Sequence, residues 1–237
     1  MGWATVALTQ NQFTYGNPAA HDADGLNFSF GASRMTAWSG GDNQMAGILL
    51  ETGSFQMGAG VWRFGDEVYS RQMISGLLAH GIGHTRLGLR VDLNQFNADG
   101  QSARHNLAFT AGGMTSIHSR LTVGAFAENL GAARLYGKPM AIRFSAGIGA
   151  RPVPQLSIAA AVMQEIRSPA SWSAGLEYAY RNQVHIRMGV GLYPYRLSAG
   201  VGFMCWRVRA DFATAYGFHT GMSLQATASV HLRRSGG

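Results

Sequence analysis

The sequence predicts an all-β protein, a transmembrane antiparallel β-barrel of about fourteen strands, with twelve as the alternative count. Three observations predict it. Apolar and polar residues alternate along many segments of about ten residues, and turn residues separate these segments at short intervals. Charged residues make up only 13% of the 237-residue chain, whereas glycine occurs 32 times. A helical membrane protein would need runs of about 20 apolar residues, and the sequence has none.

The alternation is clearest in the C-terminal half of the chain. Val184 and Ile186 fall on one side of an extended segment, and His185 and Arg187 fall on the other. Residues 196–206 repeat the pattern. Such segments make poor helices, because their apolar positions would circle the whole helix surface.

Alternation and turn signals, such as the Asp99-Gly100 pair, divide the chain into strands. A strand of about ten residues is long enough to cross a bilayer at a tilt. An N-terminal segment, residues 1–24, precedes the barrel as a candidate plug, and the barrel itself covers residues 25–234. The strands are expected at residues 25–38, 43–52, 55–64, 68–81, 83–97, 102–116, 119–129, 139–151, 155–167, 170–181, 184–194, 196–206, 207–218 and 220–233.

Alternation alone would also suit a soluble β-sandwich, so the membrane assignment needs further support. Long strands with very short turns favour a bacterial outer-membrane barrel, and in lipid the sheet must close because an open edge leaves backbone groups unpaired. Aromatic residues near strand ends favour it too, since Trp and Tyr prefer the boundary between water and lipid. These aromatic residues are Trp38, Trp62, Trp172, Tyr178, Tyr180, Tyr193, Tyr195, Trp206 and Tyr216.

Several ionisable residues fall on the polar face that would line the lumen. They form either a polar channel or ligand-lining network, or a mutually paired network that fills a narrow barrel and fixes its shape. The second interpretation is favoured, because charges inside a small barrel are best held by opposite charges. The predicted luminal set is Arg86, Arg90, Asp92, Glu128, Arg143, Glu165, Glu177, Arg187, Arg209 and Asp211.

The sequence offers little support for an enzyme, a metal site or a cofactor. His80 and His84 would lie about 13 Å apart along a strand, which is too far for one metal ion. No GxSxG motif or phosphate-binding loop occurs. We therefore expect no enzymatic activity, and a barrel enzyme that acts on lipid through a Ser–His–acid cluster at one rim is only the third hypothesis.

Charge distribution, the N-terminal residues and the single cysteine limit the classes of partner and the cellular context that we expect. The net charge is +7, but the arginines are scattered singly and Lys138 is the only lysine, which argues against nucleic-acid binding. Residues 1–8 lack the features of a signal peptide, so the expectation is a mature or trimmed chain. The single cysteine, Cys205, allows no intrachain disulfide and is expected to face lipid. The expected partners are outer-membrane lipid and other outer-membrane or secreted proteins.

Two short motifs carry a resemblance to a known family. Tyr15-Gly16-Asn17-Pro18-Ala19-Ala20, just before the first strand, looks like the Asn-Pro-Ala-Gly-Leu-type motif of the FadL-related barrels. Glu128-Asn129-Leu130-Gly131 is similar to a segment of the PorV, PorQ and PorP/SprF proteins associated with type IX secretion in Bacteroidetes. Asn17, Pro18, Asn129 and Gly131 are the matching positions. From the residues alone, Asn129-Leu130-Gly131 reads as a strand terminator, with Gly131 free to adopt a positive φ.

This resemblance implies a non-enzymatic scaffold, a docking or anchoring subunit for proteins exported by a type IX-like pathway. The alternative is a FadL-like transporter for small hydrophobic molecules, which predicts an apolar pocket inside the barrel. Phe126 and Met163 are the inward apolar candidates for that pocket.

Overall fold

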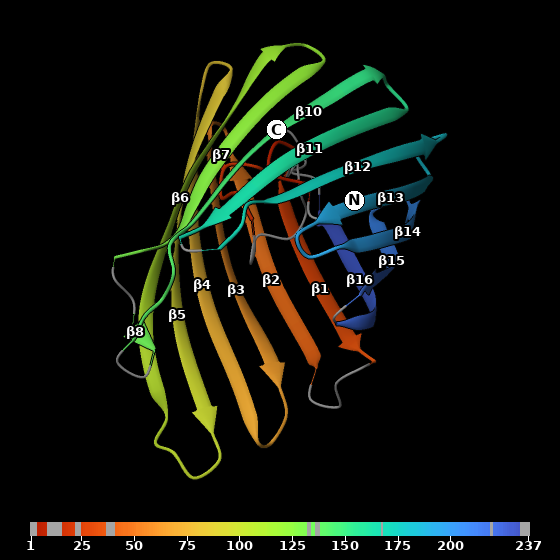
Figure 1. Cartoon of the computed structure of the whole chain (residues 1–237). Helices are drawn as coiled ribbons and strands as arrows, with labels where there is room; N and C mark the ends of the chain where they lie inside the picture. The colour runs from red at the N-terminus through yellow and green to blue at the C-terminus, as the bar shows by residue number, and fades with distance from the viewer. Residues whose placement is uncertain are drawn as a thin grey trace.

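The chain forms a closed antiparallel barrel of fourteen strands in a computed structural model (Figure 1). The structure describes residues 4–8, 16–21, 25–36, 41–131, 134–135, 138–166, 168–218 and 220–232. Within these ranges there is no helix long and apolar enough to span a membrane. The barrel strands are β1 (Leu26–Met35), β2 (Asp42–Thr52), β3 (Phe55–Gly65), β4 (Tyr69–Ile82), β5 (Thr85–Ala98), β6 (Arg104–His118), β7 (Leu121–Leu130), β10 (Arg143–Val153), β11 (Leu156–Glu165), β12 (Ser171–Tyr180), β13 (Val184–Leu192), β14 (Arg196–Cys205), β15 (Val208–Gly217) and β16 (Gly221–Leu232).

The prediction of about fourteen strands is confirmed, and every predicted strand overlaps an observed one. Each strand pairs with its neighbours in the sequence, and β1 pairs with β16 from Leu26–Leu232 to Met35–Ser223 to close the sheet. One feature was missed. Between β7 and β10 the chain forms a small separate hairpin of β8 (Arg134–Leu135) and β9 (Lys138–Pro139). The predicted strand that begins at residue 139 therefore begins later, at Arg143.

The two ends of the barrel differ in their connections. At one end, which we call the turn rim, six turns of only two or three residues join β2–β3, β4–β5, β6–β7, β10–β11, β12–β13 and β14–β15. The first strand also starts and the last strand ends there. The opposite end, the loop rim, carries the other connections, the longest of which spans residues 131–142. In outer-membrane barrels the short turns face the periplasm, so we assign the turn rim to that side.

The exterior of the barrel is apolar over most of its height, as the alternation predicts. Large side chains such as Ile74, Leu78 and Phe212 point outward and are about half exposed. A closed sheet with such an exterior is stable in lipid, where no backbone group may stay unpaired. The fold is thus that of an outer-membrane β-barrel.

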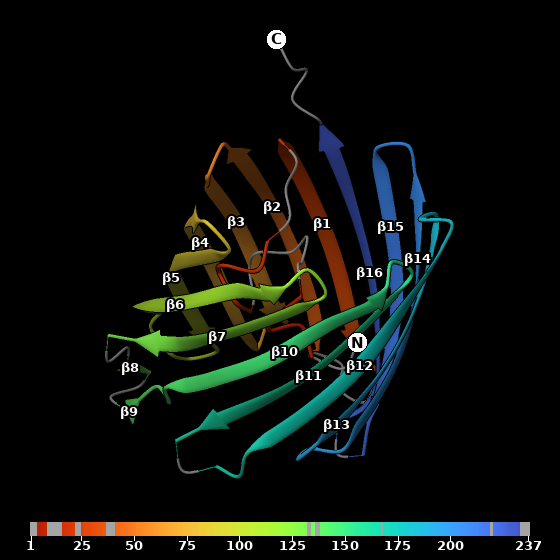
Figure 2. The ribbon, with the colours of Figure 1, turned by 90° about the horizontal axis from the view of Figure 1, so that it is seen from above.

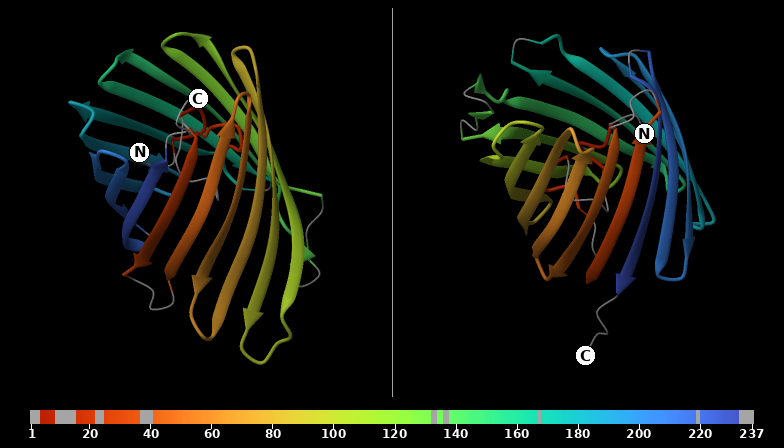
Figure 3. Two further views of the ribbon diagram at one scale, coloured as in Figure 1. Left: turned by 180° about the vertical axis from the view of Figure 1, so that it is seen from behind. Right: turned by 90° about the horizontal axis from the view of Figure 1, so that it is seen from below.

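The apolar band ends abruptly on β2 to β6. Five outward residues that pair directly across these strands are apolar, and the next outward row toward the loop rim is polar. This change marks the edge of the hydrocarbon region on that side, where β4, β5 and β6 are the longest strands and the wall extends furthest (Figure 3). The apolar row is Ala46, Val61, Ile74, Leu93 and Leu107, and the polar row is Gln44, Arg63, Gln72, Gln95 and His105.

Candidate functional site: the plugged lumen

The described parts of the N-terminal segment, residues 4–8 and 16–21, lie inside the barrel (Figure 2). Asn17 is fully buried and joins these two parts to the wall. Its side-chain amide donates hydrogen bonds to the carbonyl oxygens of Val6 and Gly113, each at 3.0 Å. Its side-chain oxygen accepts a bond from the N–H of Ala19, also at 3.0 Å. Because both amide hydrogens and the oxygen are used, Asn17 fixes the segment against β6.

A set of luminal glycines receives the segment. Real Cβ atoms essentially never come within 3.0 Å of such neighbours, yet a Cβ at Gly88 would lie 2.5 Å from the carbonyl carbon of Pro18. A Cβ at Gly124 would lie 2.7 Å from the carbonyl oxygen of Val6. Side chains here would therefore displace the plug, and glycine allows the close approach of backbone to backbone. We call this set the glycine floor: Gly88 on β5, Gly112 on β6, Gly124 on β7, and Gly147 and Gly149 on β10.

Charged and polar luminal side chains hold the carbonyl groups of the segment. Arg86 donates to the carbonyl oxygen of His21 at 2.6 Å, and Gln56 donates to the same oxygen at 3.3 Å. Arg90 donates to the carbonyl oxygen of Gly16 at 3.2 Å. The backbone of the segment is therefore bound by side chains from β3 and β5, in addition to the Asn17 contacts with β6.

An ion-pair network lies beside the segment, on β5, β7, β10 and β11. Arg90 lies 3.1 Å from Asp92 and 3.6 Å from Glu128, and the Arg90 side chain is only 3% exposed. Arg143 lies 3.2 Å from Glu128 and 3.4 Å from Glu165. Each buried charge thus faces an opposite charge, which offsets the cost of removing it from water.

A second network occupies β12, β13 and β15. Arg187 contacts Glu177 and donates to Asp211 at 2.5 Å. Arg209 lies 3.0 Å from Asp211 and 3.9 Å from Glu177. His185 lies 3.5 Å from Glu177. The two arginines and two carboxylates therefore bridge three strands.

The register places all ten residues of the predicted luminal set on the inner face of the wall, and each of them takes part in an ion pair. Glu51 was not among the predicted residues; it lies 3.9 Å from Arg86 and accepts a hydrogen bond from Gln56. Glu51 stands near the end of β2, where the alternation was hard to read. Phe126 and Met163 also face inward, and both pair with Ser145.

The motif residues of the resemblance occupy two separate places. Asn17 and Pro18 are buried in the plug. Asn129 and Gly131 lie at the end of β7, where both have positive φ, 60° and 96°. The side chain of Asn129 donates to the carbonyl oxygen of Ala141 at 2.9 Å. The prediction that Gly131 terminates the strand with positive φ is confirmed.

The prediction that Trp62 lies at the boundary between water and lipid is wrong. Trp62 faces the lumen, is only 9% exposed, and packs under the guanidinium of Arg71 at 5.4 Å. Arg71 also lies 5.1 Å from the Phe96 ring and donates to Asn94 at 2.7 Å. The position of Trp62 near a strand end suggested the boundary between water and lipid. The alternation of side chains along β3 instead decides which face of the wall its ring occupies. The other aromatic residues predicted at the boundary between water and lipid are exposed, except that Trp38 lies outside the described residues.

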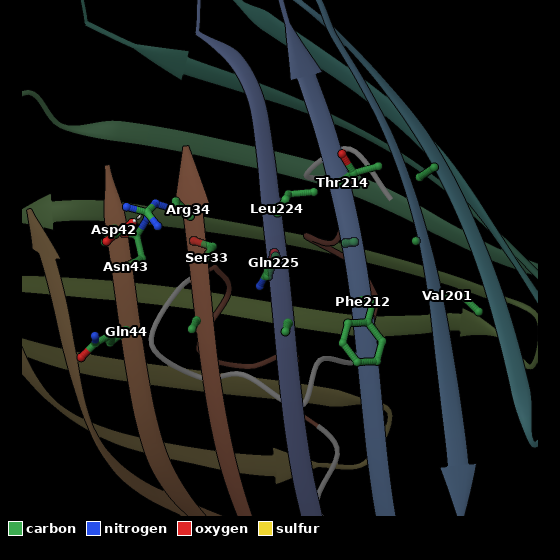
Figure 4. Close-up of a pocket in the computed structure, with 15 residues that line it drawn as sticks. Ser33, Arg34, Asp42, Asn43, Gln44, Val201, Phe212, Thr214, Leu224 and Gln225 are labelled. Atoms are coloured by element: carbon green, nitrogen blue, oxygen red, sulfur yellow. Dashed lines mark ion pairs between the residues drawn. The ribbon is translucent and has the colours of Figure 1, made fainter. Parts of the chain in front are cut away.

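A cavity of about 750 Å³ lies at the wall of β2, β1, β16, β15 and β14 (Figure 4). Each strand contributes one luminal residue and its two outward neighbours. The luminal residues form one row of direct pairs, Asn43, Ser33, Gln225, Ala213 and Gly200. Three of these five are small, which leaves open space beside the luminal face of these strands. The cavity lining is mainly apolar, with Phe212, Leu224 and Val201 among its residues.

Comparison with known proteins shows the fold. No family model matches the sequence, and no curated protein matches it. Among solved structures, the toluene transporter TodX of Pseudomonas putida is similar with a TM-score of 0.73 and 11% sequence identity, over 97% of this chain and 95% of that one. The monoaromatic hydrocarbon channel CymD has a TM-score of 0.70 and 11% identity, over 99% and 98% of the two chains. A Rh. blastica porin has a TM-score of 0.53 and 9% identity, over 86% and 98%.

These comparisons correct the functional expectation. The resemblance to PorV, PorQ and PorP/SprF, and the scaffold role in type IX secretion that it implied, are contradicted, because the similar solved structures named above are hydrocarbon channels and a porin. The motifs that suggested the scaffold have local structural roles, as a plug anchor at Asn17 and a strand terminator at Asn129-Leu130-Gly131. The FadL-like alternative agrees better with the comparisons.

Proposed function

We propose that the chain is a plugged, non-enzymatic outer-membrane channel that admits small hydrophobic molecules. The observation that carries the proposal is the N-terminal segment seated on the glycine floor, inside a barrel that matches two hydrocarbon channels over nearly its whole length. A pore for polar solutes needs a continuous open lumen. Here the segment lies against the wall from β5 to β10 and takes up part of the lumen. We therefore expect passage of a solute to depend on where the segment lies.

The lumen also provides apolar contacts that would suit a hydrophobic solute. Leu49, Leu77 and Ala79 form a buried apolar cluster on β2 and β4. Trp62 and Met73 pair directly beside one another on the luminal face of β3 and β4. Binding sites for small molecules are mostly apolar with a few polar groups that set orientation, and this combination is present on that side of the lumen.

Two uptake measurements in the same cells test the proposal. The chain is produced in the outer membrane of a Gram-negative host, and uptake of the hydrophobic dye 1-N-phenylnaphthylamine is compared with nitrocefin hydrolysis by a periplasmic β-lactamase. We expect dye uptake to rise severalfold over cells with an empty vector, with little change in nitrocefin hydrolysis. Faster nitrocefin hydrolysis without faster dye uptake would identify a general diffusion pore and contradict the proposal.

A pair of neighbouring residues provides a matched control. Trp62→Ala removes an aromatic ring from the lumen, whereas Val61→Ala changes the outer face of the same strand. If the solute contacts the luminal wall, only Trp62→Ala changes dye uptake relative to the amount of folded barrel. Equal effects of the two variants would argue that the dye does not pass through the lumen.

A further inference from the structure

The turn rim carries an uneven distribution of charge. Four consecutive turns or strand ends, from β6–β7 to β14–β15, each contribute one arginine that is exposed to solvent. The remaining two turns, at residues 53–54 and 83–84, contribute none. None of the six turns contains Asp or Glu. We call these four residues the basic arc: Arg120, Arg151, Arg181 and Arg207.

Acidic side chains outside the lumen lie at the opposite end among the described residues. Asp66, Glu67 and Asp99 are in loops of the loop rim, and Asp42 begins β2 there. Glu51 lies nearer the turn rim, but it faces inward and contacts Arg86 and Gln56. Among the residues that the structure describes, the turn rim therefore carries exposed positive charge without an exposed carboxylate beside it.

Two arginines of the basic arc stand over aromatic rings. The guanidinium of Arg181 lies 5.3 Å from the ring of Tyr180, and that of Arg207 lies 4.9 Å from the ring of Trp206. Trp206 is 84% exposed and Tyr180 is 52% exposed, and Tyr180 faces the lipid side of β12. Exposed Trp and Tyr sit at the headgroup level of a bilayer, so they hold these guanidinium groups at that same level.

The local backbone supports this placement. Trp206 has φ of 56°, a left-handed conformation that a bulky residue rarely adopts, in the two-residue turn between Cys205 and Val208. A glycine or asparagine would normally occupy such a position. The turn thus presents an exposed ring and an arginine together at the rim, although the backbone conformation at Trp206 does not favour a bulky residue.

We propose that the basic arc binds the headgroups of anionic phospholipids in the leaflet at the turn rim. Guanidinium groups match phosphate geometry and can donate two hydrogen bonds to one phosphate. Basic residues near a membrane surface favour anionic lipids additively. A lipid is the fitting occupant because the arc borders the apolar exterior of a membrane barrel, and its aromatic partners are those found at the headgroup level. The inference does not depend on what passes through the channel.

Trp206 provides a reporter inside the proposed site. Trp3, Trp38, Trp62 and Trp172 are replaced by Phe, and the remaining fluorescence is measured in bilayers of phosphatidylcholine that contain either dibrominated phosphatidylglycerol or dibrominated phosphatidylcholine. Bromine quenches a ring that it touches. We expect phosphatidylglycerol to be preferred at Trp206 by a factor of roughly 5 or more, and high salt to reduce the preference.

A quadruple variant with Arg120, Arg151, Arg181 and Arg207 replaced by Gln should lower the preference to about 1. The control variant, Arg34→Gln with Arg63→Gln, removes two outward arginines at the loop rim and should leave it unchanged. Equal quenching by the two lipids in the parent, or a preference that survives in the quadruple variant, would overturn the proposal. Equal quenching by the two lipids would instead favour an acidic protein surface as the binding partner of the basic arc.

A second measurement avoids the tryptophan replacements, in case they impair folding. Native mass spectrometry of the unaltered chain, released from mixed phosphatidylglycerol and phosphatidylcholine, counts the lipids that stay bound. The proposal requires phosphatidylglycerol to be retained by the parent and by the Arg34/Arg63 variant, and to be lost from the quadruple variant. Retention of both lipids in proportion to the mixture would refute it.

Discussion

The side chain of Asn17 donates a 3.0 Å hydrogen bond to the carbonyl oxygen of Gly113, a residue 96 positions later in the sequence. The same amide reaches the carbonyl oxygen of Val6. One buried side chain therefore joins two parts of the plug to the barrel wall. The plug is thus held by a few defined contacts, which makes its attachment open to test by single substitutions.

Asn17→Ala should release the plug without unfolding the barrel. The change leaves two carbonyl groups and the N–H of Ala19 without their buried partner, at a cost of about 1–3 kcal/mol for each unsatisfied group. We expect larger and more frequent current steps in planar bilayers and faster proteolysis within the first 24 residues. Asn97→Ala, which removes an amide near the loop rim, should behave like the parent. Unchanged conductance in Asn17→Ala would show that the plug does not depend on this residue.

A substitution in the glycine floor should displace the plug without changing Asn17. Gly88→Ala places a methyl group 2.5 Å from the backbone of Pro18, and backbone cannot move aside as a flexible side chain can. We therefore expect Gly88→Ala to raise conductance as Asn17→Ala does. Gly76→Ala on the adjacent strand meets no atom within 4 Å and serves as the control. If Gly88→Ala and Gly76→Ala have the same conductance, the glycine floor does not hold the plug by close contact.

The sequence was sufficient to predict the barrel but not the plug contacts. Period-two alternation depends only on neighbouring residues, so it locates strands and assigns Arg209 and Asp211 to the luminal face from local pattern alone. The contact between Asn17 and Gly113 depends on how far each strand is shifted past the next, and alternation carries no such information. Trp62 was misplaced for a different reason. The alternation that puts Val61 on the outer face also puts Trp62 on the luminal face, but the position of Trp62 near a strand end was given more weight.

The second luminal network should stabilise the barrel through coupled pairs. Arg187→Gln leaves Glu177 and Asp211 near one another without the guanidinium between them, so the change should lower the unfolding free energy by about 1–3 kcal/mol. Asp211→Asn alone should also destabilise, because it weakens the contacts of both arginines. In the double variant the loss of unfolding free energy should be smaller than the sum of the two single losses, because both substitutions remove the same ion pair. The measurement is guanidinium unfolding in lipid vesicles, and strict additivity would mean that the pair is not energetically coupled.

The abrupt edge of the apolar band predicts how the outer face of β4 tolerates charge. Leu78 points outward near the middle of the apolar stretch, whereas Gln72 lies in the polar row beyond its edge. Arginine on the lipid face of a barrel costs about 2–4 kcal/mol at the bilayer centre and about 0–1 kcal/mol near the interface. Leu78→Arg should therefore reduce the free energy of unfolding in vesicles by several times more than Gln72→Arg, with both variants carrying the same added charge on one strand. A similar loss in the two variants would place Gln72 within the hydrocarbon region and move the edge of the membrane toward the loop rim.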